Sequence, residues 1–192
     1  MAETLSTMLQ LGTQMPAFNL PAASGSTFSS RQLAGKPTAV VFMCNHCPFV
    51  IHVIDVLAER AHDYAGLGVE VVGINANDVT THETDSPEHM KKFVAEHGVE
   101  FPYLYDETQG TAKAFKAACT PDIFLFDKEH KLVYRGQFDA SRPSLDLPVT
   151  GEDLTAAVQA IAEGRSVSER QIPSVGCNIK WKPDNAPDYA LV

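Results

Sequence analysis

Residues 38–47 read TAVVFMCNHC, an apolar run that leads directly into two closely spaced cysteines. A continuous apolar run such as residues 38–43 is typical of a central strand covered on both faces. Beyond the cysteines, apolar residues recur at helical spacing from Val50 to Tyr64, and Gly66 ends the pattern. This spacing predicts a helix. We therefore expect the cysteine pair at the junction between a buried strand and a helix.

The rest of the sequence alternates strand-like runs with helical patterns. The expected strands are 69–74, 101–105, 122–126 and 131–138, and the expected helices are 86–98, 111–118 and 153–162. The last two strands are separated by a short polar turn and are expected to form a hairpin. Strands that alternate with helices predict an α/β fold, with a central mixed β-sheet flanked by helices on both faces.

Composition narrows the class of function. The net charge is −9 and the 15 Lys and Arg residues are spread along the chain, so we expect no nucleic-acid partner. No apolar stretch reaches membrane-spanning length, and residues 1–16 lack the basic start and apolar core of a secretory signal. Four cysteines are too few for a disulfide scaffold. We expect a cytoplasmic protein with no membrane partner, and the sequence makes no prediction of its oligomeric state.

The cysteine pair carries the candidate chemistry. A thiol at the start of a helix faces unpaired N–H groups and the positive end of the helix dipole, which lower its pKa from about 8.5 into the range ~3.5–7.5. We expect this effect at an exposed Cys44, with His46 adding positive charge when protonated and Cys47 lying about one turn further in. Such a pair suits thiol–disulfide exchange with a thiol reductant, or with a protein or small thiol that carries a disulfide. No organic cofactor is expected.

Two other interpretations of the pair stay open. A Cys-x-x-Cys pair can be half of a zinc site, but the chain has no second such pair, and the other cysteines and the histidines show no ligand spacing. We expect no metal. The domain could also be a non-catalytic module that binds a metal or a partner. We interpret the charged segment 82–89, which contains Asp85, as a solvated loop and helix face, with metal binding as the alternative.

Several stretches together resemble one known family. Cys44-Asn45-His46-Cys47, with Cys119-Thr120-Pro121 ahead of a later strand, is similar to the thioredoxin fold. The stretches MPAFNLPAASGSTFSSRQLAGKPTAVVF and FPYLYDETQGTAKAFKAACTPDIFLFDKEHKLVYRGQFDASRP resemble the alkyl hydroperoxide reductase/thiol-specific antioxidant branch, the peroxiredoxin-like redoxins. The resemblance covers about residues 12–143. It implies a thioredoxin-like domain with an N-terminal extension over residues 1–165, and a tail over residues 166–192 that packs on the same domain.

The resemblance also implies roles for individual residues. Cys44 matches the attacking cysteine of thioredoxins and Cys47 matches the resolving one. Pro121 matches a proline that is cis in this fold and lies against the disulfide. It would present the Thr120 backbone to an incoming peptide or thiol. The implied activity is thiol–disulfide exchange in antioxidant or redox homeostasis.

The residues around the pair refine this expectation. Asn45 and His46 would tune the site, since a histidine before the second cysteine is similar to the disulfide isomerase pattern, which favours the reduced thiolate. Thr38 stands where thioredoxins bury an acidic residue, so no carboxylate is expected to take the proton of the resolving thiol. Met43 stands where they have a tryptophan.

A peroxidase is the alternative within the same family. Peroxiredoxins have a threonine three residues before the attacking cysteine, and its hydroxyl orients the peroxide. Counting back from Cys44 gives Val41, and counting back from Cys47 gives Cys44, so that hydroxyl is missing. We therefore rank peroxide reduction below disulfide exchange.

The other two cysteines leave alternatives open. Cys119 lies two residues before Pro121, which in this fold brings it near the pair, and Cys177 lies in the tail. Either could take part in redox exchange, and the two could pair with each other. Either could also be a buried thiol without a redox role.

Overall fold

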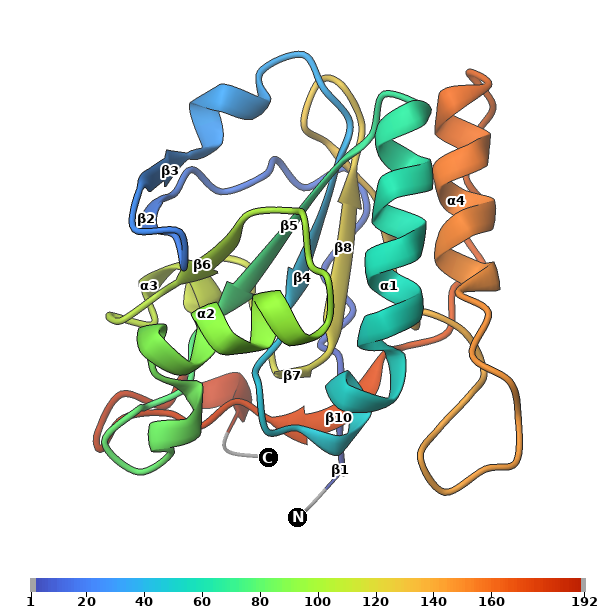
Figure 1. Ribbon diagram of the computed structural model, residues 1–192. Helices are drawn as coiled ribbons and strands as arrows, with labels where there is room; N and C mark the ends of the chain where they lie inside the picture. The colour runs from blue at the N-terminus through green and yellow to red at the C-terminus, as the bar shows by residue number, and fades with distance from the viewer. Residues whose placement is uncertain (1–2, 191–192) are drawn as a thin grey trace.

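The computed structural model describes residues 3–190. Its main sheet has five strands in the spatial order β6-β5-β4-β8-β9. Strands β6, β5, β4 and β8 are labelled in Figure 1. Their bounds are β4 (Thr38–Phe42), β5 (Glu70–Asn75), β6 (Tyr103–Tyr105), β8 (Asp122–Phe126) and β9 (Leu132–Arg135). Strand β4 pairs parallel to β5 and antiparallel to β8. The predicted mixed sheet and the predicted β8–β9 hairpin are both confirmed.

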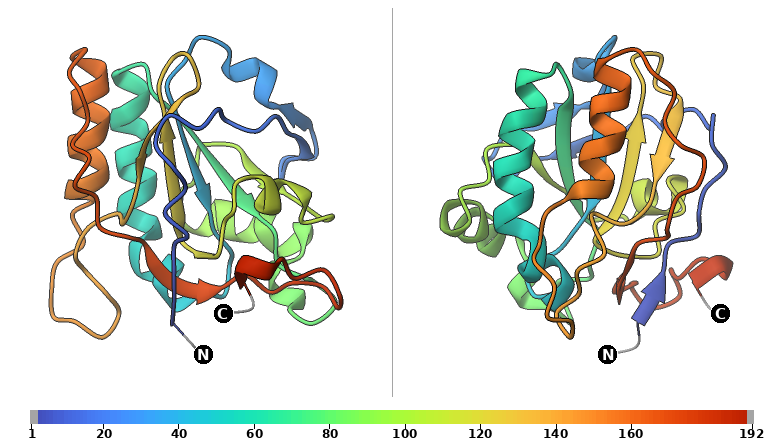
Figure 2. Two further views of the ribbon diagram at one scale, coloured as in Figure 1. Left: turned by 180° about the vertical axis from the view of Figure 1, so that it is seen from behind. Right: turned by 90° about the vertical axis from the view of Figure 1, so that its right-hand side faces the viewer.

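Helices cover both faces of this sheet. The helices are α1 (Pro48–Gly66), α2 (Pro87–Glu96), α3 (Gly110–Ala114) and α4 (Glu152–Ala162). Because side chains alternate along a strand, Ala39 and Val41 of β4 pack in the core with α1, α2 and α4. Val40 and Phe42 point the other way and pack in a second core that contains α3. Figure 2 shows α1 and α4 side by side along one face.

Two small sheets lie outside the main one. In the first, β10 (Val175–Asn178) pairs antiparallel with β1 (Glu3–Leu5) on one side and with β7 (Cys119–Thr120) on the other. This sheet lies at the end of the main sheet where α1 begins (Figures 1 and 2). The second sheet joins β2 (Asn19–Pro21) to β3 (Thr27–Ser29). The described chain also contains three short 3-10 helices, which are η1 (Ser30–Leu33), η2 (Glu83–Asp85) and η3 (Asp188–Ala190).

Most element bounds lie within two residues of the expected ones, and two elements end earlier than that. The helix expected over 111–118 ends at Ala114, because Lys116 adopts a left-handed φ of 52° that no α-helix continues through. The strand expected over 131–138 covers only Leu132–Arg135. None of the helices described over residues 3–190 is long and apolar enough to cross a membrane.

Phe115 lies at the centre of the second core. Its ring contacts Phe18, Phe42, Phe124 and Phe126, with centroid separations of 6.2, 5.4, 5.8 and 5.8 Å. Its side chain is fully buried. This core supports the face of β4 and β8 opposite α1, and so fixes the strand that leads into the cysteine pair and the strand that follows Pro121.

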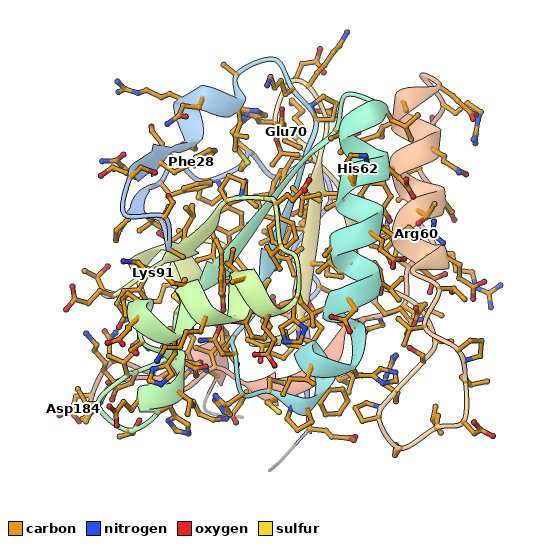
Figure 3. All side chains as sticks on the ribbon, viewed as in Figure 1. Phe28, Arg60, His62, Glu70, Lys91 and Asp184 are labelled. Atoms are coloured by element: carbon orange, nitrogen blue, oxygen red, sulfur yellow. The ribbon has the colours of Figure 1, made fainter. Side chains whose placement is uncertain are left out.

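We expect Phe115→Ala to lower the free energy of unfolding by about 3–5 kcal/mol, because it deletes a buried ring and leaves a cavity. Denaturant unfolding measures the change. Phe28→Ala is the matched control, since this half-buried ring lies on β3 at the edge of the molecule (Figure 3). A loss no larger than that of the control would show that the aromatic cluster does not hold this face together.

Candidate active site

The cysteine pair precedes α1 instead of forming its first turn. Helix α1 begins at Pro48, and Cys47 is its N-cap residue with extended backbone angles of φ −70° and ψ 122°. A proline disfavours the helical conformation in the residue before it, while it fits well at the first helical position itself. The expectation that Cys47 lies a turn inside the helix is therefore wrong. Cys44 lies on the loop between β4 and α1.

Both sulfurs are enclosed by protein. Cys44 is 1% exposed and Cys47 is 0% exposed, and their thiols hydrogen-bond to each other. The Cys44 sulfur lies 3.6 Å from the Thr120 hydroxyl, and the protonated Cys47 thiol donates to the Thr120 carbonyl oxygen at 3.1 Å. The Thr120–Pro121 bond is cis, as predicted. The two cysteines and Thr120 thus form one cluster, and the predicted exposure of Cys44 is wrong.

When the pair carries one negative charge, that charge lies mainly on Cys47. Hydrogen bonding from the Cys44 thiol lowers the pKa of Cys47 to about 5, against the opposing effect of burial, and the Thr120 and Cys177 side chains and the Cys177 backbone also lower it. The pKa of Cys44 is raised well above its ordinary value, because its thiol is the donor to Cys47, because it is buried, and because Asp85 is negatively charged. The prediction of a low-pKa Cys44 is wrong for the reduced protein.

Asp85 belongs to the site, although its sequence surroundings predict a solvated position. Its carboxylate accepts hydrogen bonds from the Asn45 backbone N–H at 2.8 Å, from His46 Nδ1 at 2.7 Å and from Asn77 Nδ2 at 2.8 Å. Burial would raise the pKa of Asp85, but these hydrogen bonds outweigh it and hold the pKa below its usual range. The interpretation of segment 82–89 as fully solvated is wrong at this position, because Asp85 is buried.

The loop that carries Asp85 is fastened to the site at several points. Asn75 Nδ2 donates to the Asp85 carbonyl oxygen at 2.7 Å, and Asn45 Nδ2 donates to the Thr84 carbonyl oxygen at 2.8 Å. The Tyr103 hydroxyl donates to Asn45 Oδ1 at 3.0 Å. Asn45, which the sequence analysis singled out, therefore acts as a link between the cysteine loop and the loop of Asp85.

Cys44, His46 and Asp85 form a compact group. Their sulfur, nitrogen and oxygen atoms lie within 4.8 Å of one another, and His46 Nδ1 lies 3.9 Å from the Cys44 sulfur. Thr38 is buried in β4 and donates to the Lys36 carbonyl oxygen. Asp85 therefore brings a carboxylate beside Cys44 from another loop, whereas Thr38 offers none to the resolving Cys47. The group also offers three ligand types that zinc accepts.

The remaining cysteines have different surroundings. The Cys119 thiol donates toward the carbonyl oxygens of Pro121 and Ser174, at 3.6 and 4.0 Å, and burial raises its pKa. Cys177 lies on β10 directly opposite Thr120, and its side chain and backbone lower the pKa of Cys47. All four cysteines are free thiols. The structure thus places Cys177 against the Cys-x-x-Cys pair.

Strand β10 also covers Thr120. Thr120 is 3% exposed, and the β7–β10 pairing continues through it. The approach is so close that a Cβ atom on Gly176 would fall 2.0 Å from the Thr120 carbonyl oxygen. The expectation that the Thr120 backbone faces an incoming partner is therefore wrong for this state of the protein, since the chain's own tail occupies that position.

The comparisons with known proteins agree with this architecture. Residues 11–135 match the model of the AhpC/TSA family. The chain belongs to the AhpC/TSA family. It is 27% identical over 125 residues to the thiol-disulfide oxidoreductase ResA of Bacillus thuringiensis, which covers 65% of this chain and 68% of that protein. The predicted family and thioredoxin-like fold are both confirmed.

Solved structures extend the likeness of this AhpC/TSA chain beyond the matched region. An uncharacterized conserved protein from Geobacillus kaustophilus is 50% identical, with a TM-score of 0.93 over 96% of this chain and 98% of the other. A hypothetical protein from Sinorhizobium meliloti is 46% identical, with a TM-score of 0.91 over 93% and 98%. A thiol:disulfide interchange protein from Chlorobium tepidum shares the fold, with a TM-score of 0.63 at 20% identity over 80% and 98%.

We expect Cys44→Ala to raise the pKa of Cys47 from about 5 toward the ordinary value of ~8.5, because the variant lacks the strongest donor to that sulfur. The thiolate forms as pH rises through the pKa, so the variant should hold less thiolate than the natural chain in mildly acidic solution. Thiolate absorbance measured against pH gives the midpoint. Cys119→Ala is the matched control and should leave it unchanged; an unchanged midpoint in Cys44→Ala would contradict the hydrogen-bond assignment.

Asp85→Asn should lower the pKa of Cys44, because it removes the negative charge that opposes ionisation of that thiol. The second thiolate step of the same titration should then move to lower pH. Asp78→Asn tests the specificity, since Asp78 is also a buried aspartate but caps Thr80 instead of contacting the cysteine loop. Equal shifts in the two variants would refute a local role for Asp85.

Proposed function

We propose that the protein is a thiol–disulfide oxidoreductase that uses Cys44 and Cys47. The observation that carries this proposal is the pair itself: two free thiols joined by a hydrogen bond, one of them favoured as a thiolate, and both in contact with Thr120, whose bond to Pro121 is cis. A dithiol with one ready thiolate is suited to two-step exchange. Membership of the AhpC/TSA family and a relative named thiol-disulfide oxidoreductase support the proposal.

We assign the attack to Cys44. It lies on the loop beside Asn45 and His46, which are only partly buried, whereas Cys47 lies beneath Thr120 and β10. A shift of the Cys44 proton to Cys47, along the hydrogen bond that joins them, makes Cys44 the thiolate. This route lets the buried Cys47 serve as the local base that activates its neighbour.

The exchange then balances in two steps. The Cys44 thiolate attacks one sulfur of the partner disulfide, so a mixed disulfide forms and the first partner thiolate leaves with the proton held by Cys47. The Cys47 thiolate attacks the Cys44 sulfur, closes the Cys44–Cys47 bond and releases the second partner thiolate, which takes a proton from water. The partner gains two electrons, and a separate thiol reductant returns two electrons to the protein.

His46 and Asp85 act as positioning residues in this scheme. Asp85 accepts hydrogen bonds from both His46 Nδ1 and the Asn45 N–H, so it fixes the loop that carries Cys44. His82 stacks on His46 with ring centroids 4.9 Å apart. We propose that this arrangement holds the Cys44 sulfur toward an incoming disulfide. The partner would be a small thiol or a disulfide-bearing protein, and the cysteine usage favours work in the cytoplasm.

The decisive experiment is a redox equilibrium of the full chain against glutathione, with mass-spectrometric mapping of every disulfide. We expect a reversible Cys44–Cys47 bond with a potential between about −270 and −180 mV, the range from thioredoxin to protein disulfide isomerase. Cys44→Ser should abolish this bond, and Cys119→Ser should leave its potential unchanged. If the bond forms at no ratio of reduced to oxidised glutathione, the proposal fails.

Two further assays distinguish the alternatives. Hydrogen peroxide should be consumed more slowly than a model disulfide is reduced, because Val41 offers no hydroxyl to orient a peroxide. Metal analysis of the purified protein tests the ligand group formed by Cys44, His46 and Asp85. Faster turnover with peroxide would favour a peroxidase, and stoichiometric zinc would favour a metal-binding module.

A further inference from the structure

The proposed exchange leaves the thiol of Cys177 without a role, although it touches the reacting pair. We infer that Cys177 is a third redox thiol of this site. It forms a Cys47–Cys177 disulfide in place of the Cys44–Cys47 disulfide. The inference rests on the proposed function, because it begins from the oxidised Cys44–Cys47 pair.

The strand pairing brings Cys177 to Cys47. Cys177 is the direct partner of Thr120 in the β10–β7 pair, and the carbonyl oxygen of Thr120 lies 3.1 Å from the Cys47 sulfur. The two thiols also influence each other, since Cys177 lowers the pKa of Cys47 and Cys47 raises the pKa of Cys177. A disulfide requires two cysteines that already lie close together, and both of these lie against Thr120.

Cys119 provides an internal comparison. It lies on the same pair of strands, where it is opposite Asn178, and it is as deeply buried as Cys177. Its thiol nevertheless points to the carbonyl oxygens of Pro121 and Ser174. Burial in this small sheet therefore does not by itself bring a cysteine to the pair; the position opposite Thr120 does.

Strand β10 is held firmly in this register. Gly176, beside Cys177, approaches the Thr120 carbonyl so closely that no larger residue fits, and β1 pairs along the other side of β10. On either side of the strand, the Ser174 hydroxyl donates to the Gly136 carbonyl oxygen at 2.6 Å, and the Lys180 N–H donates to Asn77 Oδ1 at 2.8 Å. The tail thus fixes the sulfur of Cys177 against Cys47.

The exchange needs no additional oxidant. The Cys177 sulfur attacks the Cys47 sulfur of the Cys44–Cys47 bond, so the Cys47–Cys177 bond forms as the Cys44–Cys47 bond breaks. Cys44 leaves as a thiolate and takes the proton that Cys177 gives up. One disulfide is present before and after, so no electrons are gained or lost. Burial raises the pKa of Cys177 to about 12, so its thiol stays protonated in the reduced protein. The step returns Cys44 as a thiol while the protein remains oxidised.

The test maps disulfides in the full chain after equilibration with reduced and oxidised glutathione and alkylation under acid quench. The natural chain should yield both Cys44–Cys47 and Cys47–Cys177 peptides. Cys44→Ser should yield Cys47–Cys177 as its intramolecular bond, and Cys177→Ser should yield Cys44–Cys47 alone. Gly176→Ala should lose the Cys47–Cys177 bond and keep Cys44–Cys47, because it pushes β10 away from Thr120.

Gly66→Ala is the matched control, since a Cβ at Gly66 meets no atom within 4 Å, and it should behave as the natural chain does. The inference is overturned if Cys44–Cys47 forms in the natural chain while neither that chain nor Cys44→Ser yields Cys47–Cys177. A Cys119–Cys177 bond in its place would overturn it equally. If the natural chain forms no Cys44–Cys47 bond, the failure lies in the proposed function itself. Cys44→Ser keeps Gly176 and so decides the question even if Gly176→Ala does not fold.

Discussion

Strand β4 pairs with β5 on one side and with β8 on the other, and this pairing assembles the site. Because β4 and β5 are parallel, the loops that follow them emerge at the same edge of the sheet. Because β8 runs antiparallel to β4, its first residue lies opposite the last residue of β4, at the same edge. The loop with Cys44, the loop with Asp85 and the cis bond before Pro121 therefore meet, although they are far apart in sequence.

Exclusion of water gives this edge its chemistry. Ionising both thiols would place two negative charges in a site enclosed by protein, which costs much free energy. The state of lowest free energy therefore has one proton shared between the two sulfurs. Hydrogen-bond donors around Cys47 favour charge there, while the carboxylate of Asp85 opposes charge on Cys44. The same carboxylate accepts a hydrogen bond from the backbone of the Cys44 loop. One side chain therefore both raises the pKa of Cys44 and fixes the loop that carries it.

The sequence predicts the parts of the structure that have long, periodic signals. Strand β4, helix α1 and the β8–β9 hairpin were all expected, and so was the cis Pro121 through the family resemblance. The start of α1 was missed although Pro48 signals it, because the residue before a proline is pushed to extended angles. The expectation of a low pKa at Cys44 depends on the same wrong helix start, because it places Cys44 at the first turn of the helix.

Asp85 and β10 had no comparable signal. Asp85 lies in a 3-10 helix of three residues, too short for periodicity, and neighbouring charges made the segment resemble solvated surface. Its role depends on the parallel pairing of β4 with β5, and no local sequence pattern indicates that pairing. Strand β10 has four residues and pairs with partners near residue 4 and residue 120. The resemblance predicts that the tail packs on the domain but not where it packs, and a single glycine such as Gly176 has many explanations.

The covering of the site by β10 has a consequence for how the protein is made. Synthesis proceeds from the N-terminus, so Cys44 and Cys47 leave the ribosome well before β8, and β10 follows much later. While the chain is growing, the two thiols lie uncovered beside whatever thiols and oxidants the surrounding solution contains. The last strand to arrive encloses them, so the nascent protein is the form of this molecule in which the pair is most open to chance oxidation.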